Sequence, residues 1–100
     1  SIPDQAIYEG QSFTNINLDN YVVDYDNADD ELTWSYTGNA DLLVSIVDRM
    51  ASITIPNAFW TGTEAITFRA TDLQGYFAET TANFSVLSWP SRNWLPMIIN

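Results

Sequence analysis

The 100-residue chain contains no cysteine and no histidine, and three arginines supply all of its basic side chains. The lack of cysteine excludes disulfides, thiolate metal sites and thiol catalysis. The lack of histidine removes the most common general base and the most common zinc ligand. No apolar run approaches the roughly 18–20 residues that a transmembrane helix requires, so we expect no membrane insertion. The remaining chemistry rests on carboxylates, hydroxyls and amides.

The charge is strongly one-sided, with 13 acidic against three basic residues and a formal net charge of −10. Nucleic-acid recognition needs basic side chains that displace counterions, so a nucleic-acid partner is excluded. A hydrophobic content of 46% is too high for a disordered chain. We therefore expect about one folded domain. Because the chain opens on Ser-Ile-Pro rather than Met, we also expect it to be part of a larger protein.

Apolar and polar residues alternate in several short segments with the period of two that a half-buried β-strand requires. In residues 65–71, Ile66, Phe68 and Ala70 share one face, and threonines and an arginine occupy the other. Glycine, asparagine and aspartate between the segments indicate turns. Strands are expected at residues 3–8, 13–23, 31–36, 42–47, 51–55, 65–71 and 77–86.

This pattern predicts an all-β fold, an antiparallel seven-stranded β-sandwich with immunoglobulin-like (cadherin-like) Greek-key topology. Residues 1–87 form the sandwich, and Trp34 is expected in its core between the two sheets. Residues 88–100, "SWPSRNWLPMIIN", lack alternation and are expected to be an atypical C-terminal tail or linker.

Acidic residues gather in "DYDNADDE" at residues 24–31. In the expected sandwich, the loops that carry Asp24, Asp26 and Asp72 lie at the same end as the N-terminus, and so does the turn at Asp48. Two carboxylates about 4 Å apart repel by about 1 kcal/mol in water and by about 4 kcal/mol at an effective dielectric of 20. A calcium ion held by loop oxygens would remove this cost. A fully solvated acidic loop is the alternative.

Four phrases, "IPDQAIYEGQSF", "YVVDYDNADDELTWS", "ITIPNAFWTGTEAITFRATDLQG" and "ANFSV", resemble the cadherin-like and immunoglobulin-like repeats of large bacterial surface and secreted proteins. The resemblance covers residues 2–86. It implies a non-catalytic structural or adhesion module, located outside the cell or at its surface. It also implies that neighbouring repeats of the same chain, and a cell-surface protein or glycan, are the partners.

The resemblance further implies calcium between successive repeats. In that family an Asp-x-Asp and a later Asp face the preceding repeat, and they match Asp24, Asp26 and Asp72. A glutamate near the end of the first strand belongs to the half-site at the opposite end, and it matches Glu9. At that end "FWTGTE" stands in place of the family's acidic segment and leaves Glu64 as an oxygen donor.

The alternative function is a carbohydrate-binding or accessory spacer module of a secreted hydrolase, which would require a planar row of exposed aromatic residues. Trp34 alternates into the core, and Trp60 before a Thr-Gly turn is expected to cap it. Trp89 and Trp94 lie in the tail. Catalysis is not expected, because without histidine or cysteine it would rest on a carboxylate pair or a metal.

Overall fold

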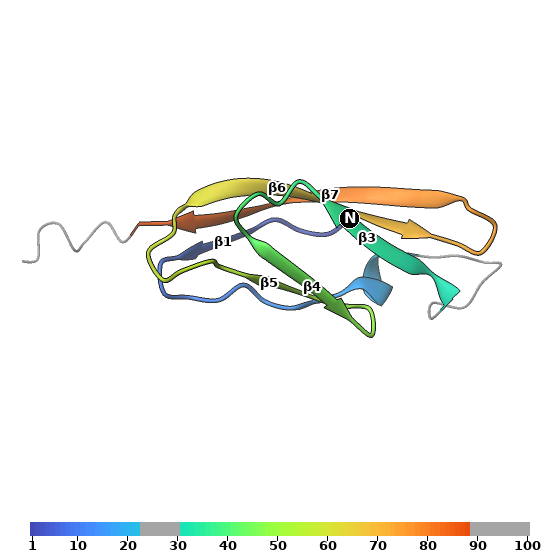
Figure 1. The fold of residues 1–100 in the computed structure, drawn as a ribbon, viewed down its shortest axis with the longest axis horizontal. Helices are drawn as coiled ribbons and strands as arrows, with labels where there is room; N and C mark the ends of the chain where they lie inside the picture. The colour runs from blue at the N-terminus through green and yellow to red at the C-terminus, as the bar shows by residue number, and fades with distance from the viewer. Residues whose placement is uncertain (23–30, 89–100) are drawn as a thin grey trace, which may run out of the picture.

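A computed structural model describes residues 1–22 and 31–88, which form two β-sheets in two layers (Figure 1). Within these residues there are seven strands and a short 3₁₀ helix, so the expected all-β class and strand number are confirmed there. The elements are β1 (Gln5–Tyr8), β2 (Ile16–Asn17), η1 (Leu18–Tyr21), β3 (Thr33–Thr37), β4 (Leu43–Val47), β5 (Met50–Thr54), β6 (Gly62–Thr71) and β7 (Phe77–Leu87).

The first sheet has the strand order β1-β7-β6-β3 and the second has the order β2-β5-β4. β1 pairs with β7 in parallel, with Gln5 opposite Phe84 and Tyr8 opposite Leu87. The expectation of a wholly antiparallel sandwich is therefore wrong for this pair. After β1 the chain crosses to the other sheet instead of folding back as a hairpin, so the first and last strands lie side by side and run in the same direction (Figure 1).

The second strand is much shorter than the expected range 13–23. Among the residues that the structure describes, Ile16 and Asn17 alone of this segment pair with β5. At Leu18 the chain enters η1, where the Asn17 side chain accepts a hydrogen bond from the backbone N–H of Asp19 at 3.2 Å. This cap satisfies an N–H at the start of the helical turn and so ends the strand.

The inward faces of the two sheets form the core. The largest fully buried side chains are Phe68, Phe84, Leu18, Leu42, Ile66 and Val86. The Phe84 ring meets Phe13 and Phe68 edge to face, with centroids 5.4 and 6.5 Å apart. Trp34 packs against this core but is only half-buried, because β3 is the outermost strand of its sheet.

The chain enters the sandwich partway along its length and leaves it at one end (Figure 1). Ile2 is buried, and its N–H lies 3.4 Å from the hydroxyl of Thr80, which is opposite Phe68 within the β6–β7 pair. β7 ends at Leu87, where its carbonyl accepts the N–H of Glu9 at 3.0 Å. The β4–β5 turn and the β6–β7 loop both lie towards the other end, as the sequence predicted (Figure 1).

Candidate functional site

Asp72 begins the loop between β6 and β7 and organises it. Its Oδ1 atom accepts the backbone N–H groups of Gln74 and Tyr76 at 2.9 and 3.0 Å. Its own N–H donates to the Tyr76 carbonyl at 2.8 Å. The side chain is half-buried, and within the described part of the chain its Oδ2 atom makes no hydrogen bond. The carboxylate is therefore held in place with one oxygen available, which suits a cation ligand.

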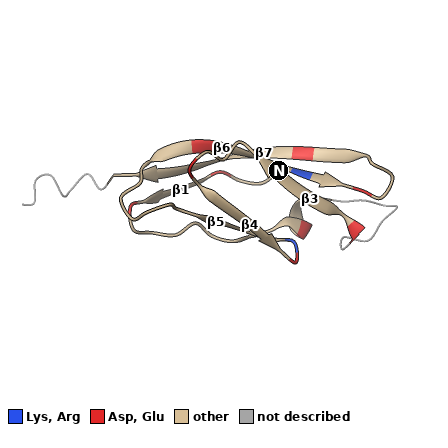
Figure 2. Cartoon of the chain, in the orientation of Figure 1, with Lys and Arg blue, Asp and Glu red and all other residues tan. Residues whose placement is uncertain are grey.

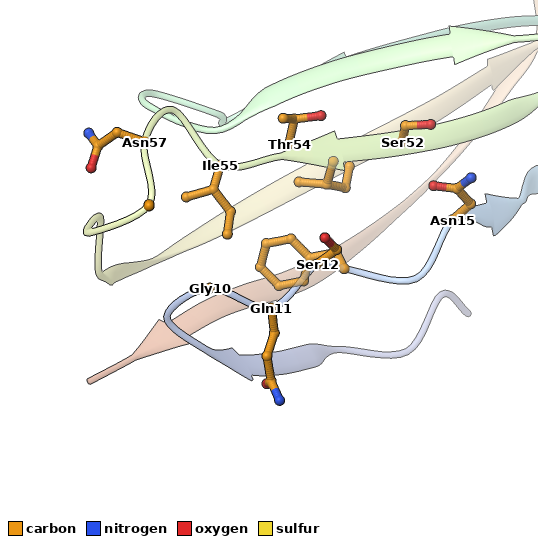
Figure 3. A pocket seen from close by; sticks show the side chains of 11 residues that line it. Gly10, Gln11, Ser12, Asn15, Ser52, Thr54, Ile55 and Asn57 are labelled. Atoms are coloured by element: carbon orange, nitrogen blue, oxygen red, sulfur yellow. The ribbon is translucent and has the colours of Figure 1, made fainter. Parts of the chain in front are cut away.

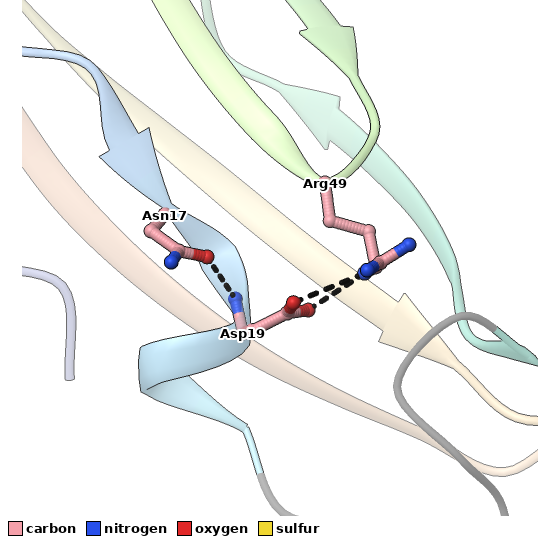
Figure 4. A network of polar contacts seen from close by, with 3 residues as sticks. All are labelled: Asn17, Asp19 and Arg49. Atoms are coloured by element: carbon pink, nitrogen blue, oxygen red, sulfur yellow. Dashed lines mark hydrogen bonds and ion pairs between the residues drawn. The ribbon is translucent and has the colours of Figure 1, made fainter.

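A second acidic residue, Asp19 in η1, lies at the same end and forms an ion pair (Figure 4). The Arg49 Nε atom donates to its two carboxylate oxygens at 2.8 and 3.1 Å. The Asp19 side chain is 27% exposed and the Arg49 side chain is 31% exposed. Sequence reasoning missed this pair, because 30 residues separate its members, although Arg49 stood out as one of three arginines.

The turn between β4 and β5 places Asp48 at this end as expected. Asp48 and Arg49 both have positive φ, 50° and 64°. Two such residues in a two-residue loop match the twist of a β-hairpin. Figure 2 shows acidic residues at both ends of the sandwich, with a basic residue at this turn.

The structure describes only some of the calcium ligands that were predicted from the sequence. Asp24 and Asp26 lie outside the described residues. Among residues 1–22 and 31–88, no three acidic side chains come together in a group that could hold a metal ion. A calcium site formed by Asp24, Asp26 and Asp72 stays a prediction.

Glu9 lies at the other end of the sandwich, where its N–H donates to the Leu87 carbonyl at 3.0 Å. Its side chain is half-buried. Glu9 and Asp72 lie far apart, as expected, because Glu9 bonds to Leu87 at one end of β7 and Asp72 follows Thr71, which is opposite Phe77 at the other end.

Glu64 has a structural role that the sequence did not reveal. Its Oε1 accepts the N–H groups of Ala40 and Leu42 at 2.9 and 3.2 Å, and its Oε2 accepts that of Asp41 at 2.8 Å. The carboxylate thus holds the loop between β3 and β4. Both oxygens accept N–H groups of this loop, so Glu64 anchors the loop.

Trp60 caps the core at the same end, as predicted. Its ring lies over Gly62 and packs against the core, and its Nε1–H donates to the Asp41 carboxylate at 3.1 Å. Other exposed aromatic side chains are spread over η1, β3, β7 and two loops: Tyr21, Tyr36, Phe59, Tyr76 and Phe77. Within the described ranges they do not form the planar row that a sugar-binding sheet face would need.

A groove of about 440 Å³ lies between residues 10–15 and β5 (Figure 3). We call it the β5 groove. Ile55 points into it, Phe13 is a second apolar residue of its lining, and several hydroxyl and amide side chains complete the lining. Its lining residues are Gly10, Gln11, Ser12, Phe13, Asn15, Ser52, Ile53, Thr54, Ile55, Asn57 and Ala58. None of them carries a charge, which is unusual in so acidic a chain.

No helix in the described part of the chain is long and apolar enough to cross a membrane. No protein-family model matches the chain, and no curated protein matches it. Among solved structures it is similar to the solution structure of the PKD domain from KIAA 1837 protein, with a TM-score of 0.54 and 17% identity. The match covers 88% of this chain and 83% of that one. At this identity it shows the fold, an immunoglobulin-like β-sandwich.

Proposed function

We propose that the chain is a non-catalytic structural module of a larger extracellular protein, in which it connects neighbouring domains and carries tension between them. One observation carries this proposal. β1 and β7 are the first and last strands, they pair in parallel, and the chain enters and leaves at opposite ends of that pair. A force applied to the two ends of the chain would therefore act parallel to the hydrogen-bonded β1–β7 pair.

The direction in which each β1 backbone group points can be assigned residue by residue. The N–H of Glu9 donates to the Leu87 carbonyl, and β-strand residues alternate in the direction of their backbone groups. Gln5 and Ile7 therefore also face β7, and Ala6 and Tyr8 face away. The N–H of Tyr8 accordingly donates to the Gln11 side chain at 2.8 Å.

Side chains extend this connection beyond the strand. The Asp4 carboxylate accepts the N–H of Asn83 at 2.8 Å, and Ile2 is buried beside Thr80. Tension applied at the two ends would load all of these bonds in shear, so that they must break together. The rate of forced unfolding is set by the barrier that they create.

Force spectroscopy on tandem copies tests the proposal. Ile7→Pro removes an N–H that faces β7, and Ala6→Pro removes one that faces away from β7. Ile7→Ala controls for the lost side chain. We expect Ile7→Pro to lower the unfolding force more than either control. Equal effects of all three variants would refute a tension-bearing role for this pair.

We also propose that calcium stiffens the N-terminal end through Asp24, Asp26 and Asp72, with Glu9 belonging to a half-site at the other end. Calcium would supply positive charge where these carboxylates otherwise repel one another. The orientation of Asp72 by its loop supports this assignment, because its Oδ2 atom remains available to a cation.

Thermal unfolding in EDTA and in about 10 mM calcium, with magnesium as a control, tests the metal site. Extracellular loop sites bind calcium at about 10⁻⁴–10⁻³ M. A ten- to hundredfold excess should stabilise the fold by roughly 1.4–2.7 kcal/mol. Asp72→Asn keeps the Oδ1 acceptor but removes the charge, so it should abolish the response without weakening the calcium-free fold. An unchanged melting temperature would refute the site.

The extracellular or cell-surface location and the neighbouring repeats as partners are part of this proposal. They are supported by the resemblance of residues 2–86 to bacterial surface repeats and by the immunoglobulin-like fold shared with a PKD domain. An adhesive contact with a cell-surface protein or glycan would add to the structural role. The carbohydrate-binding alternative has less support, because the exposed aromatic residues of the described part of the chain are spread over η1, β3, β7 and two loops.

A further inference from the structure

The pairing between β2 and β5 stops early and leaves part of β5 open. Ile16 is opposite Ala51, Asn17 is opposite Met50, and the N–H of Leu18 donates to the Arg49 carbonyl at 2.9 Å. The same register, continued backwards along the chain, would place Thr14 opposite Ile53. Within the described residues the ladder ends at Ile16.

The side chain of Gln5 explains why the ladder ends there. Its Oε1 accepts the N–H of Thr14 at 2.8 Å, and its Nε2 donates to the Thr14 carbonyl at 3.0 Å. A carboxamide offers one acceptor and two donors, so it can replace a strand residue as a partner. Gln5 thus engages both backbone groups of Thr14 that would otherwise pair with Ile53.

The backbone of Ile53 faces the β5 groove. The two-residue turn at Asp48 and Arg49 makes Val47 and Met50 a hydrogen-bonded pair, so Met50, Ser52 and Thr54 direct their backbone groups towards β4. Ala51 and Ile53 direct theirs to the other side, where Ala51 meets Ile16. No described backbone group bonds to Ile53 on that side. An open strand edge of this kind is a template for another strand.

We propose that the β5 groove binds an uncharged, extended peptide segment that pairs with the backbone of Ile53. A peptide strand presents a donor and an acceptor on the same edge at every second residue, which is the spacing that an open β edge requires. Phe13, Ile53 and Ile55 offer an apolar floor to its inward side chains. The lining residues carry no charge, and the chain's net charge of −10 disfavours an acidic segment.

The dimensions of the β5 groove limit the length of the peptide segment that it can bind. Successive strand residues rise by about 3.3 Å, so the run from Ile53 to Ile55 faces roughly three residues of a partner. A groove of about 440 Å³ lies in the lower part of the range of ligand sites, roughly 300–1,000 Å³, so it holds only a short segment. Binding is therefore expected to be weak for a single segment and to act as a contact within or between neighbouring chains.

Titration of the full chain followed by NMR tests the proposal. The probe is the pentapeptide acetyl-Thr-Val-Thr-Val-Thr-amide, and we expect it to shift the Ile53 amide signal and to slow its hydrogen exchange. The same peptide with N-methylated amides cannot donate hydrogen bonds, and it should bind roughly tenfold more weakly or worse. Equal binding of the two peptides would overturn the proposal, and so would preferential binding of maltopentaose or of an acidic peptide.

Substitutions in the protein locate the site. Ser12 lines the groove and is exposed, so Ser12→Trp should block the peptide without unfolding the chain. Ser35→Trp, at an exposed serine on β3 of the other sheet, is the matched control. Gln5→Leu releases Thr14 to pair with Ile53, and it should slow exchange of the Ile53 amide without any peptide. Binding that survives Ser12→Trp but is lost in Ser35→Trp would refute the assignment.

Discussion

Replacing Glu64 with alanine should destabilise the sandwich by about 2 kcal/mol. Its carboxylate accepts three backbone N–H groups, and the contacts to Ala40 and Asp41 are the shortest, at 2.9 and 2.8 Å. A hydrogen bond to a charged group contributes about 1.5–3 kcal/mol when it is buried. Glu64 is half-buried, so water replaces part of each bond, and about 1 kcal/mol for each of the two short contacts is reasonable. The third contact, to Leu42, is longer at 3.2 Å.

Urea denaturation and thermal unfolding measure this loss. A change of about 2 kcal/mol corresponds to a fall in melting temperature of roughly 8–16 °C for a domain of this size. Glu79→Ala is the matched control, because Glu79 forms an ion pair with Arg69 in which both side chains are about 40% exposed. Such surface pairs contribute about 0–1 kcal/mol. If Glu64→Ala cost no more than Glu79→Ala, the anchoring role of Glu64 would be wrong.

Three further predictions concern the backbone, the ion pair and the core. Gly38→Ala should cost about 1–3 kcal/mol in unfolding free energy, because φ is +100° and the added Cβ would collide with the Ala65 carbonyl. Gly10→Ala is the control: φ is +85° but the space around the added Cβ is open, so it should cost less in the same denaturation assay. A double-mutant cycle on Asp19 and Arg49 should give a coupling of about 0.5–1 kcal/mol that falls in 1 M salt, and a salt-independent value would contradict an ion pair. Phe84→Ala should lower the unfolding free energy by about 3–5 kcal/mol, because the ring is fully buried. Phe77→Ala, at a side chain that is largely exposed, should lower it far less, and similar values for the two variants would refute the core assignment.

The strands were predictable because alternation is a local property. Ile66, Phe68 and Ala70 are buried on one face of β6, as their spacing indicated. The same alternation, with turns between strands, predicted which loops share an end of the sandwich. The structure places the Asp72 loop and the β4–β5 turn together at one end and Glu9 at the other.

Other features depend on bonds between residues far apart in the sequence. Gln5 to Thr14, Glu64 to the β3–β4 loop and Arg49 to Asp19 each join a side chain to a group nine to 30 residues away. An Asp, Glu or Gln in a polar position has many partners available, and sequence spacing does not select among them. For this reason Glu64 could be considered as a cation ligand from the sequence and proved to be a loop anchor in the structure.

By itself, the sequence determined an acidic, histidine-free and cysteine-free β domain, and it determined which side chains face the core, because composition and period-two alternation act residue by residue. The tertiary structure alone decided that β1 lies parallel to β7, that β2 is reduced to two residues, and that Ile53 faces an uncharged groove. Strand partners are selected by the packing of the whole chain and by side chains that compete for backbone groups. That competition becomes visible only once the strands lie side by side.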